Sequence, residues 1–309
     1  MSNNAPISSK NLTKFYGKHR GISGVNLEIN EGEVFGLLGP NGAGKTTCIR
    51  IFLDFIRPTS GSAKVLGMDS RSESLEIRRN TGYLPGDFIT YEKLTAEELL
   101  QYFANLRGGH LSKARVLAER FDLDLSRKIG ELSRGNRQKV GLIQAFMSDP
   151  KLLILDEPTT GLDPLLQQEF HALVLEEAAS GKTIFVSSHV LPEVEIICDR
   201  VGIIREGSIV AVEEVATLRK QTVTKIAIEF EEAVSKADFE KIAGVSEVAI
   251  KDHHLTCNVT GSLDSLIKLA AKYTVVNLQS GHPALEEVFL TFYNPVSYTH
   301  LTLPTILLV

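Results

Sequence analysis

The first two-thirds of the chain alternates short apolar runs with segments whose apolar residues recur at helical spacing. Runs of strand length lie at Glu33 to Gly39 (EVFGLLG), Lys151 to Leu155 (KLLIL) and Thr183 to His189 (TIFVSSH). The segments that follow them show the period of helices, with apolar residues three or four apart. Strands that alternate with helices are typical of a parallel sheet, so we predict an α/β fold.

The first region also contains two predicted N-terminal strands and a long helical stretch. Residues 7 to 32 predict two short strands around a polar turn, and Pro58 stops the first predicted helix, TTCIRIFLDFI. From about residue 88 to 130 the pattern is helical, and Thr95 with Glu98 forms a capping box. We interpret this stretch as a helical insertion in a domain that covers residues 1–216 and closes with the hairpin VGIIREGSIVA.

The pattern restarts after about residue 222. Strand, helix, strand, strand, helix and strand follow one another, and a last helix is predicted at ALEEVFLTFY. This order is that of a split βαβ unit of ferredoxin-like type, so we expect a small α+β domain over residues 222–295. It can bind a ligand, contact the tail of a partner or brace a dimer, and the last two are the simpler interpretations. His253 and His254 lie in a polar turn and are expected to be solvated.

Composition narrows the class of protein. The 309 residues suffice for two domains, and 43% apolar with 23% charged residues is ordinary for a soluble protein. A net charge of −5 favours neither nucleic acid nor anionic lipid. Three scattered cysteines indicate a reducing compartment and neither a disulfide nor a zinc site. We see no signal peptide and no membrane span, so we expect a cytoplasmic chain.

The segment Gly39 to Thr47, GPNGAGKTT, fits the phosphate-binding pattern G-x-x-x-x-G-K-[ST] between a predicted strand and a predicted helix. Gly42 and Gly44 let backbone N–H groups approach a phosphate closely, because no Cβ intervenes. Lys45 then reaches the outer phosphates, the Thr46 hydroxyl can bind magnesium, and Thr47 is a further donor. A chance match is improbable in this strand–loop–helix context.

Asp156 and Glu157 end a buried strand and are followed by Pro158. Two carboxylates at such a place are costly unless they hold a metal or take part in chemistry. The carboxyl ends of parallel strands meet at one edge of the sheet, so both residues are expected to face the phosphate loop. Magnesium chemistry is therefore the favoured interpretation.

Three other features admit a plain structural interpretation beside a functional one. Tyr16 can stack on a base or be part of the core. Ser133 to Asn136 caps a predicted helix, whose N-terminus can also attract an anion. His189, at the end of a strand, is more often structural than catalytic. Asp163 and Pro164, at the start of the next predicted helix, are typical of a cap and a first helical position.

Taken together, the motifs of residues 7 to 216 resemble the nucleotide-binding subunit of ATP-binding cassette (ABC) transporters. Six motifs occur in the family's order. The first two are Tyr16 as the adenine-stacking aromatic and the Walker A loop, which comprises Gly39, Pro40, Asn41, Gly42, Ala43, Gly44, Lys45, Thr46 and Thr47. The third is the signature, formed by Leu132, Ser133, Arg134, Gly135 and Asn136. The last three are Walker B (Leu152 to Glu157), the D-loop (Gly161 to Asp163) and the switch histidine His189.

The resemblance implies a P-loop ATPase that works as a head-to-tail dimer of identical or related subunits. Each ATP would lie between Walker A of one chain and the signature of the other. Thr46 and Asp156 would hold Mg²⁺, Glu157 would polarise the attacking water, and His189 would contact the γ-phosphate. Asp163 would link the two sites across the interface.

This chain departs from the family pattern at two places. The usual signature is LSGGQ, so Arg134 and Asn136 replace a glycine and a glutamine, while Ser133 and Gly135 remain. The family's glutamine after the strand that reads GYLP is replaced by Gly86 and Asp87. Two interpretations of Asp87 stay open: it ligates magnesium directly, or the sensing role of this loop is weaker.

The resemblance also implies partners and a location. A separate membrane permease would dock at the helical insertion and the loop Gly86 to Ile89, so the chain would touch the membrane only through it. Motif details are most similar to the ABC-2 group of prokaryotic exporters, which places the subunit at the cytoplasmic face. A soluble ABC ATPase of the cluster-assembly type is the alternative, although the tail domain argues against it. A regulator without turnover is disfavoured by the presence of Glu157.

The last residues of the chain are not part of either predicted domain. Val296 to Thr305, VSYTHLTLPT, is what one reading frame of a widely used transposon-based sequencing adaptor encodes. Our hypothesis is that Val296 to Val309 is adaptor read-through rather than part of the natural protein.

Overall fold

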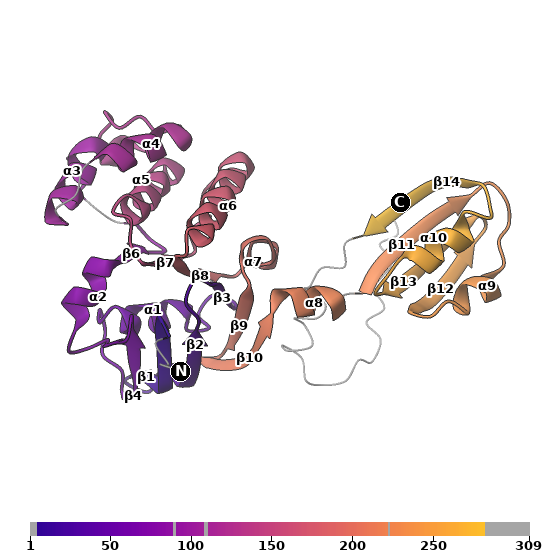
Figure 1. The fold of residues 1–309 in the computed structure, drawn as a ribbon, viewed down its shortest axis with the longest axis horizontal. Helices are drawn as coiled ribbons and strands as arrows, with labels where there is room; N and C mark the ends of the chain where they lie inside the picture. Colours follow the sequence, from indigo (N-terminus) through magenta and orange to yellow (C-terminus); the bar gives the residue numbers. More distant parts are fainter. Residues whose placement is uncertain (1–4, 89–90, 108–110, 222, 282–309) are drawn as a thin grey trace, which may run out of the picture. The chain divides into compact units, whose positions relative to one another are not determined.

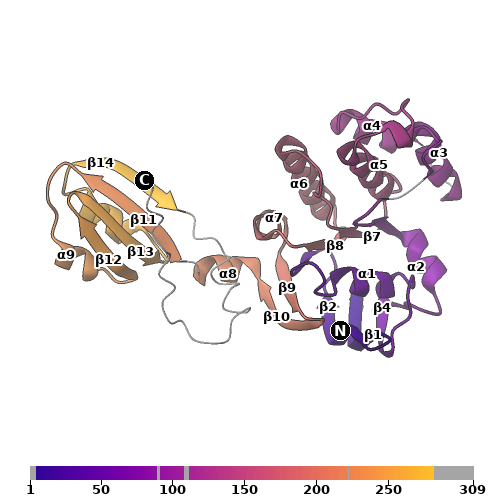
Figure 2. The ribbon, with the colours of Figure 1, turned by 180° about the vertical axis from the view of Figure 1, so that it is seen from behind.

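The computed structural model describes residues 5–88, 91–107, 111–221 and 223–281. Contacts between residues divide the chain into two units, Met1–Thr217 and Leu218–Val309. The first unit runs from indigo to orange in Figures 1 and 2, and the second ends in yellow. Each unit is described separately.

A six-stranded sheet forms the centre of the first unit, in the order β10–β9–β3–β8–β7–β6. Its strands are β3 (Val34–Leu38), β6 (Thr81–Leu84), β7 (Leu152–Asp156), β8 (Thr183–Ser188), β9 (Arg200–Arg205) and β10 (Ser208–Glu214). Neighbours are parallel except for the antiparallel β9–β10 hairpin. The strands β3, β7 and β8 are buried along their whole length, and their sequences are mainly apolar. The polar exceptions are Thr183 and, at the carboxyl ends, Asp156, Ser187 and Ser188.

A second, antiparallel sheet has the order β2–β1–β4–β5. It comprises β1 (Ile7–Tyr16), β2 (His19–Ile29), β4 (Ser60–Val65) and β5 (Met68–Asp69). Helix α1 (Lys45–Phe52) shares one apolar core with both sheets, in which Phe52 lies edge-on to Phe185 of β8. This core supports the loop between β3 and α1 from behind.

Helix α1 ends before Pro58, so the prediction that the proline stops it was wrong. Asp54 takes the left-handed conformation with φ 55°. The Phe55 N–H then donates to the Arg50 carbonyl at 2.7 Å, which closes a Schellman-type end. An aspartate thus takes the place that glycine usually has, and this signal was overlooked.

The remaining helices of this unit include the predicted insertion. They are α2 (Ser74–Asn80), α3 (Ala96–Leu106), α4 (Ser112–Arg120), the 3₁₀ turn η1 (Ile129–Glu131), α5 (Arg134–Phe146), α6 (Pro164–Ala179), α7 (Leu191–Ile197) and α8 (Val215–Gln221), which crosses into the second unit. The predicted capping box is confirmed, because Glu98 N–H donates to Thr95 Oγ1 at 3.1 Å and Thr95 N–H to Glu98 Oε2 at 2.8 Å.

Ion pairs join the insertion to the sheet domain. Arg120 of α4 contacts Glu169 and Glu176 of α6, and Lys113 lies 2.9 Å from Glu177. These contacts hold the pKa of Glu176 below its usual range, because its carboxylate accepts from the Arg120 guanidinium. No described helix has the length and apolar character needed to cross a bilayer.

The second unit has the predicted ferredoxin-like order. Its elements are β11 (Val223–Phe230), α9 (Lys236–Glu240), β12 (Val245–Lys251), β13 (His254–Thr260), α10 (Asp264–Ala270) and β14 (Val275–Gly281). The antiparallel sheet runs β12–β13–β11–β14. Ile228 and Phe230 of β11 share a core with Phe239 of α9 and Leu266 of α10. The predicted helix ALEEVFLTFY and the segment Val296–Val309 lie outside the described residues.

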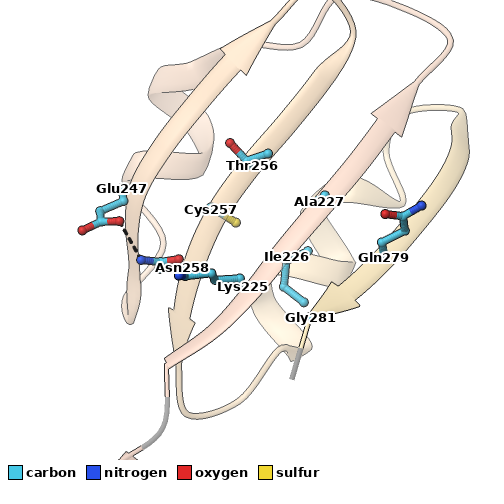
Figure 3. A pocket seen from close by; sticks show the side chains of 9 residues that line it. All are labelled: Lys225, Ile226, Ala227, Glu247, Thr256, Cys257, Asn258, Gln279 and Gly281. Carbon is cyan, nitrogen blue, oxygen red and sulfur yellow. Dashed lines mark hydrogen bonds between the residues drawn. The ribbon is translucent and has the colours of Figure 1, made fainter. Parts of the chain in front are cut away.

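A shallow cavity of about 420 Å³ lies on the sheet of this second unit (Figure 3). It is lined by Lys225, Ile226, Ala227, Glu247, Thr256, Cys257, Asn258, Gln279 and Gly281. Asn258 donates to Glu247 across it at 2.7 Å. Its lining mixes apolar side chains with one lysine and one glutamate, Lys225 and Glu247.

Candidate nucleotide-binding site

The predicted phosphate loop connects β3 to α1, as the strand–loop–helix pattern requires. Gly44 caps the helix with φ 110°, a conformation that disfavours any residue with a Cβ. A Cβ there would also lie 2.6 Å from the Ile22 side chain and 2.8 Å from the Gly21 carbonyl. The loop is therefore packed closely on β2, and only glycine fits at its end.

Lys45 is held by its own loop. Its ammonium donates to the carbonyls of Gly39 at 2.6 Å and Pro40 at 3.2 Å, although the residue is only 5% exposed. Glu157 Oε1 lies 3.0 Å from the same nitrogen. That contact is an ion pair without hydrogen-bond geometry, because the buried Oε1 accepts no hydrogen bond from the described residues. This oxygen of Glu157 is thus ion-paired with Lys45 beside the loop but accepts no hydrogen bond from the described residues.

Asp156 ends β7 and is tied to two neighbours. Oδ2 accepts from the Thr46 hydroxyl at 2.8 Å, and Oδ1 accepts from the Ser187 hydroxyl. Ser187 stands opposite Asp156 in the parallel pairing of β7 with β8. Burial, together with the charge of Asp156, raises the pKa of Tyr83 to about 12. Both carboxylate oxygens of Asp156 therefore accept hydrogen bonds, and one of the donors belongs to the first turn of α1.

Glu157 takes a left-handed conformation with φ 51°, which is rare for a residue other than glycine. Its N–H donates to the Ser187 carbonyl at 3.1 Å, and its own carbonyl accepts from Thr160 N–H at 3.2 Å. Oε2 lies 2.6 Å from Nδ1 of His189. Strain of this kind, about 1–3 kcal/mol, is typical of functional positions. The bend joins the ends of β7 and β8 through one carboxylate–imidazole contact.

These residues border a cavity of about 340 Å³. It is lined by Tyr16, Arg20, Gly21, Asn41, Gly42, Gly44, Lys45, Thr46, Thr47 and Glu157. Tyr16 is 44% exposed, and its hydroxyl lies 3.5 Å from Thr47 Oγ1. Of the other predicted loop residues, Pro40 contributes its carbonyl and Ala43 is buried against the core.

Sequence reasoning missed Arg20 and Ser187. Arg20 pairs with Phe15 across the β1–β2 hairpin, one position from Tyr16, so the hairpin pairing was the signal that places it at the cavity. Ser187 lies two residues before His189, opposite Asp156. Recognising it required the register of two strands far apart in the sequence.

The predicted signature residues lie away from the cavity of their own chain. Leu132 is buried, and Ser133 caps α5 by accepting from Asn136 N–H at 3.2 Å. Arg134 is exposed, and none of the five residues Leu132–Asn136 lines the cavity. Gly135 packs on Gly161, and a Cβ on Gly135 would lie 2.6 Å from the Gly161 carbonyl. The start of α5 is thus fitted to the turn that precedes α6.

Asp163 is a helix cap, whereas Asp87 is an exposed loop residue outside the cavity. Asp163 caps α6 as predicted, because its Oδ1 accepts from Leu166 N–H at 3.0 Å, with Pro164 as the next residue. Asp87 is exposed and does not line the cavity. Its neighbour Gly86 comes closer, since a Cβ there would lie 3.5 Å from the Asp156 carboxylate. A metal-binding role for Asp87 stays a prediction.

Comparison with known proteins gives the family. Residues 22–160 match the family model "ABC transporter". The probable multidrug ABC transporter ATP-binding protein YbhF of Escherichia coli (strain K12) is 38% identical over 211 residues. That match covers 66% of this chain and only 36% of YbhF. The bacitracin transport ATP-binding protein BcrA of Bacillus licheniformis is 38% identical over 209 residues, which cover 66% of this chain and 68% of BcrA.

A solved structure agrees with these matches. A dimeric ATP-binding cassette in a post-hydrolysis state, bound to ADP and Pi, superimposes with a TM-score of 0.63 at 26% identity. The superposition covers 68% of this chain and 98% of that one. The family predicted from six ordered motifs is thereby confirmed, and the chain belongs to the ATP-binding proteins of ABC transporters.

Proposed function

We propose that the chain hydrolyses ATP as one half of a head-to-tail dimer and powers export through a separate membrane permease. The observation that carries this proposal is the contact of Glu157 with His189 beside Lys45. Phosphoryl transfer to water is catalysed mainly by positioning and charge stabilisation. A carboxylate next to the phosphate loop, with lone pairs beyond its contacts to Lys45 and His189, can orient and polarise the attacking water.

The other residues of the cavity contact different parts of the ATP molecule in our proposal. In our proposal the backbone N–H groups of Asn41, Gly42 and Gly44 and the ammonium of Lys45 contact the phosphates. The Ala43 N–H instead donates to the Pro40 carbonyl at 3.1 Å. Tyr16, which is partly exposed at the same cavity, offers an aromatic surface to the adenine. His189 contacts the γ-phosphate while its Nδ1 stays paired with Glu157.

Magnesium fits the pair of oxygens that Thr46 and Asp156 present. Thr46 Oγ1 and Asp156 Oδ2 are hard donors 2.8 Å apart, beside the phosphate loop. Magnesium usually takes one or two protein oxygens and fills its shell with phosphate and water. In keeping with this, no group of three or more His, Cys, Asp or Glu side chains suited to a metal occurs among the described residues. When bound, the ion neutralises phosphate charge; Asp87 is a further candidate ligand.

A second subunit completes the site. Arg134 and Gly135 of the same chain lie against Gly161, and none of the five signature residues lines the cavity. The similar cassette described as a dimer bound to ADP and Pi supports a paired arrangement. In our proposal Ser133 and Gly135 of one chain contact the ATP held by the other, and Asp163 links the two sites. The partner is a second copy or a related subunit.

A groove beside the helical insertion is the proposed dock of the permease. Its cavity of about 250 Å³ is lined by Leu53, Phe55, Arg78, Thr81, Tyr83, Pro85, Phe88, Phe103, Arg107 and Gln144. Phe55 is 49% exposed at its rim. An exposed aromatic next to a groove is typical of a protein interface. The names of YbhF and BcrA, a probable multidrug transporter and a bacitracin transport protein, support our proposal of export. For such a role we propose that the subunit binds at the cytoplasmic face of the membrane.

The Phe55→Glu variant tests the dock. We expect co-purification with a co-expressed ABC permease that the wild type captures to fall at least about tenfold, because a buried unpaired charge at an interface costs several kcal/mol. Loss of stimulation of hydrolysis by the permease should accompany it, whereas the basal rate of the isolated subunit should not change.

The matched control is Leu175→Glu on α6, where the apolar side chain is equally exposed at 47%. This variant should bind the permease like the wild type. Equal capture of both variants would show that the groove is not part of the interface. Failure of the wild type itself to capture the permease would favour a soluble ATPase.

A further inference from the structure

A buried carboxylate on α7 joins the two segments that carry Glu157 and His189. Glu193 is 9% exposed. Its Oε1 accepts from the Thr159 hydroxyl, and its Oε2 accepts from the Ser188 hydroxyl at 3.0 Å. Thr159 lies two residues beyond Glu157, and Ser188 directly precedes His189. One side chain therefore bonds to both catalytic segments.

Packing alone gives no reason for a carboxylate at this place. Leu191, Val194 and Ile197 already bury α7. No ion pair of Glu193 is present among the described residues. Burial lowers the pKa of His171, although the charge of Glu193 acts in the opposite direction. A buried carboxylate with hydroxyl donors only is costly. Its presence favours a role in the site over a role in stability.

The anchored segments also meet the phosphate loop. The Ser188 carbonyl accepts from Gly39 N–H at 3.2 Å, and the Ser187 carbonyl accepts from Glu157 N–H at 3.1 Å. A shift of Ser188 would move His189 relative to the loop, and a shift of Thr159 would relax the left-handed bend at Glu157. The 2.6 Å contact of Glu157 with His189 depends on both.

We infer that Glu193 is a positioning residue for ATP hydrolysis: by holding Thr159 and Ser188 it fixes Glu157 and His189 relative to each other. The inference rests on the proposed function. Glu193 does not line the cavity, so its loss should impair the chemical step and leave nucleotide binding unchanged.

The test measures kcat, KM and ATP affinity of the full chain for Glu193→Ala, Glu193→Gln, Thr159→Val and Ser188→Ala. We expect kcat of Glu193→Ala to fall about tenfold or more with KM within about twofold, and Glu193→Gln to recover part of the loss. Each single hydroxyl variant should give a smaller loss of the same kind. If Glu193→Ala does not fold, the two hydroxyl variants carry the test alone. Ile196→Ala, an exposed position of α7, is the control.

A double-mutant cycle separates positioning from general loosening of the fold. In a His189→Ala background, Glu193→Ala should lower kcat by less than in the wild type, because the pair that it aligns is already broken. An equal fold-change in both backgrounds, or a kcat within about twofold of wild type in the single variants, would overturn the inference. A wild type without turnover would instead contradict the proposed function and the inference together.

Discussion

Glu157→Gln is expected to lower ATP turnover by about 10²- to 10⁴-fold, the range seen when a general base is lost. Glutamine matches the shape of glutamate but has no negative charge to polarise water. Lys45 keeps its contacts with the Gly39 and Pro40 carbonyls, so ATP should bind at least as tightly as in the wild type. The variant should therefore accumulate as an ATP-bound dimer.

Two measurements check this expectation: single-turnover hydrolysis and the elution volume of the variant with ATP and Mg²⁺. The control is Glu76→Gln, the same change at an exposed glutamate of α2 that pairs with Arg79. It should hydrolyse ATP like the wild type. Undiminished turnover by Glu157→Gln would mean that another group activates the water.

Gly135→Ala is expected to reduce turnover by about tenfold or more while the isolated subunit still binds ATP. The new methyl group would lie 2.6 Å from the Gly161 carbonyl, closer than Cβ contacts in real proteins. The obstacle is backbone, so the start of α5 must move, at a cost of about 1–3 kcal/mol for overpacking. Because that segment is the proposed contact with the partner's ATP, dimerisation should suffer first.

ATP-dependent dimerisation and nucleotide affinity of the monomer are the measurements for Gly135→Ala. Gly281→Ala is the matched control, since a Cβ there meets the Lys225 carbonyl at 3.5 Å, an ordinary contact. A Gly135→Ala protein that dimerises and turns over normally would show that the signature segment tolerates displacement.

The features that sequence analysis predicted correctly depend on neighbours in the chain. The capping box of Thr95 with Glu98 and the cap by Asp163 involve residues three positions apart. The phosphate loop is likewise one continuous segment between a strand and a helix. Local hydrogen bonds of this kind follow from residue type and spacing, which a sequence displays directly.

The features that were missed depend on distant pairing. Ser187 reaches Asp156 only because β7 and β8 pair in one particular register, and Glu193 joins two loops from a third element. Apolar patterns show that a strand is buried but not which residue of its neighbour stands opposite. The left-handed conformation of Glu157 was missed for a related reason, since its N–H bonds to Ser187 of a distant strand. Asp54 differs, because its bend is a local helix end whose signal was present in the sequence.

The most direct test of the shared-site mechanism is the rate of ATP hydrolysis as a function of protein concentration, with residues 296–309 removed. A site built from two chains predicts a rate that rises more steeply than linearly until the dimer saturates, because each ATP needs the signature of a partner. A strictly linear rate from the lowest concentrations, with a monomer as the only species in the presence of ATP, would contradict the account.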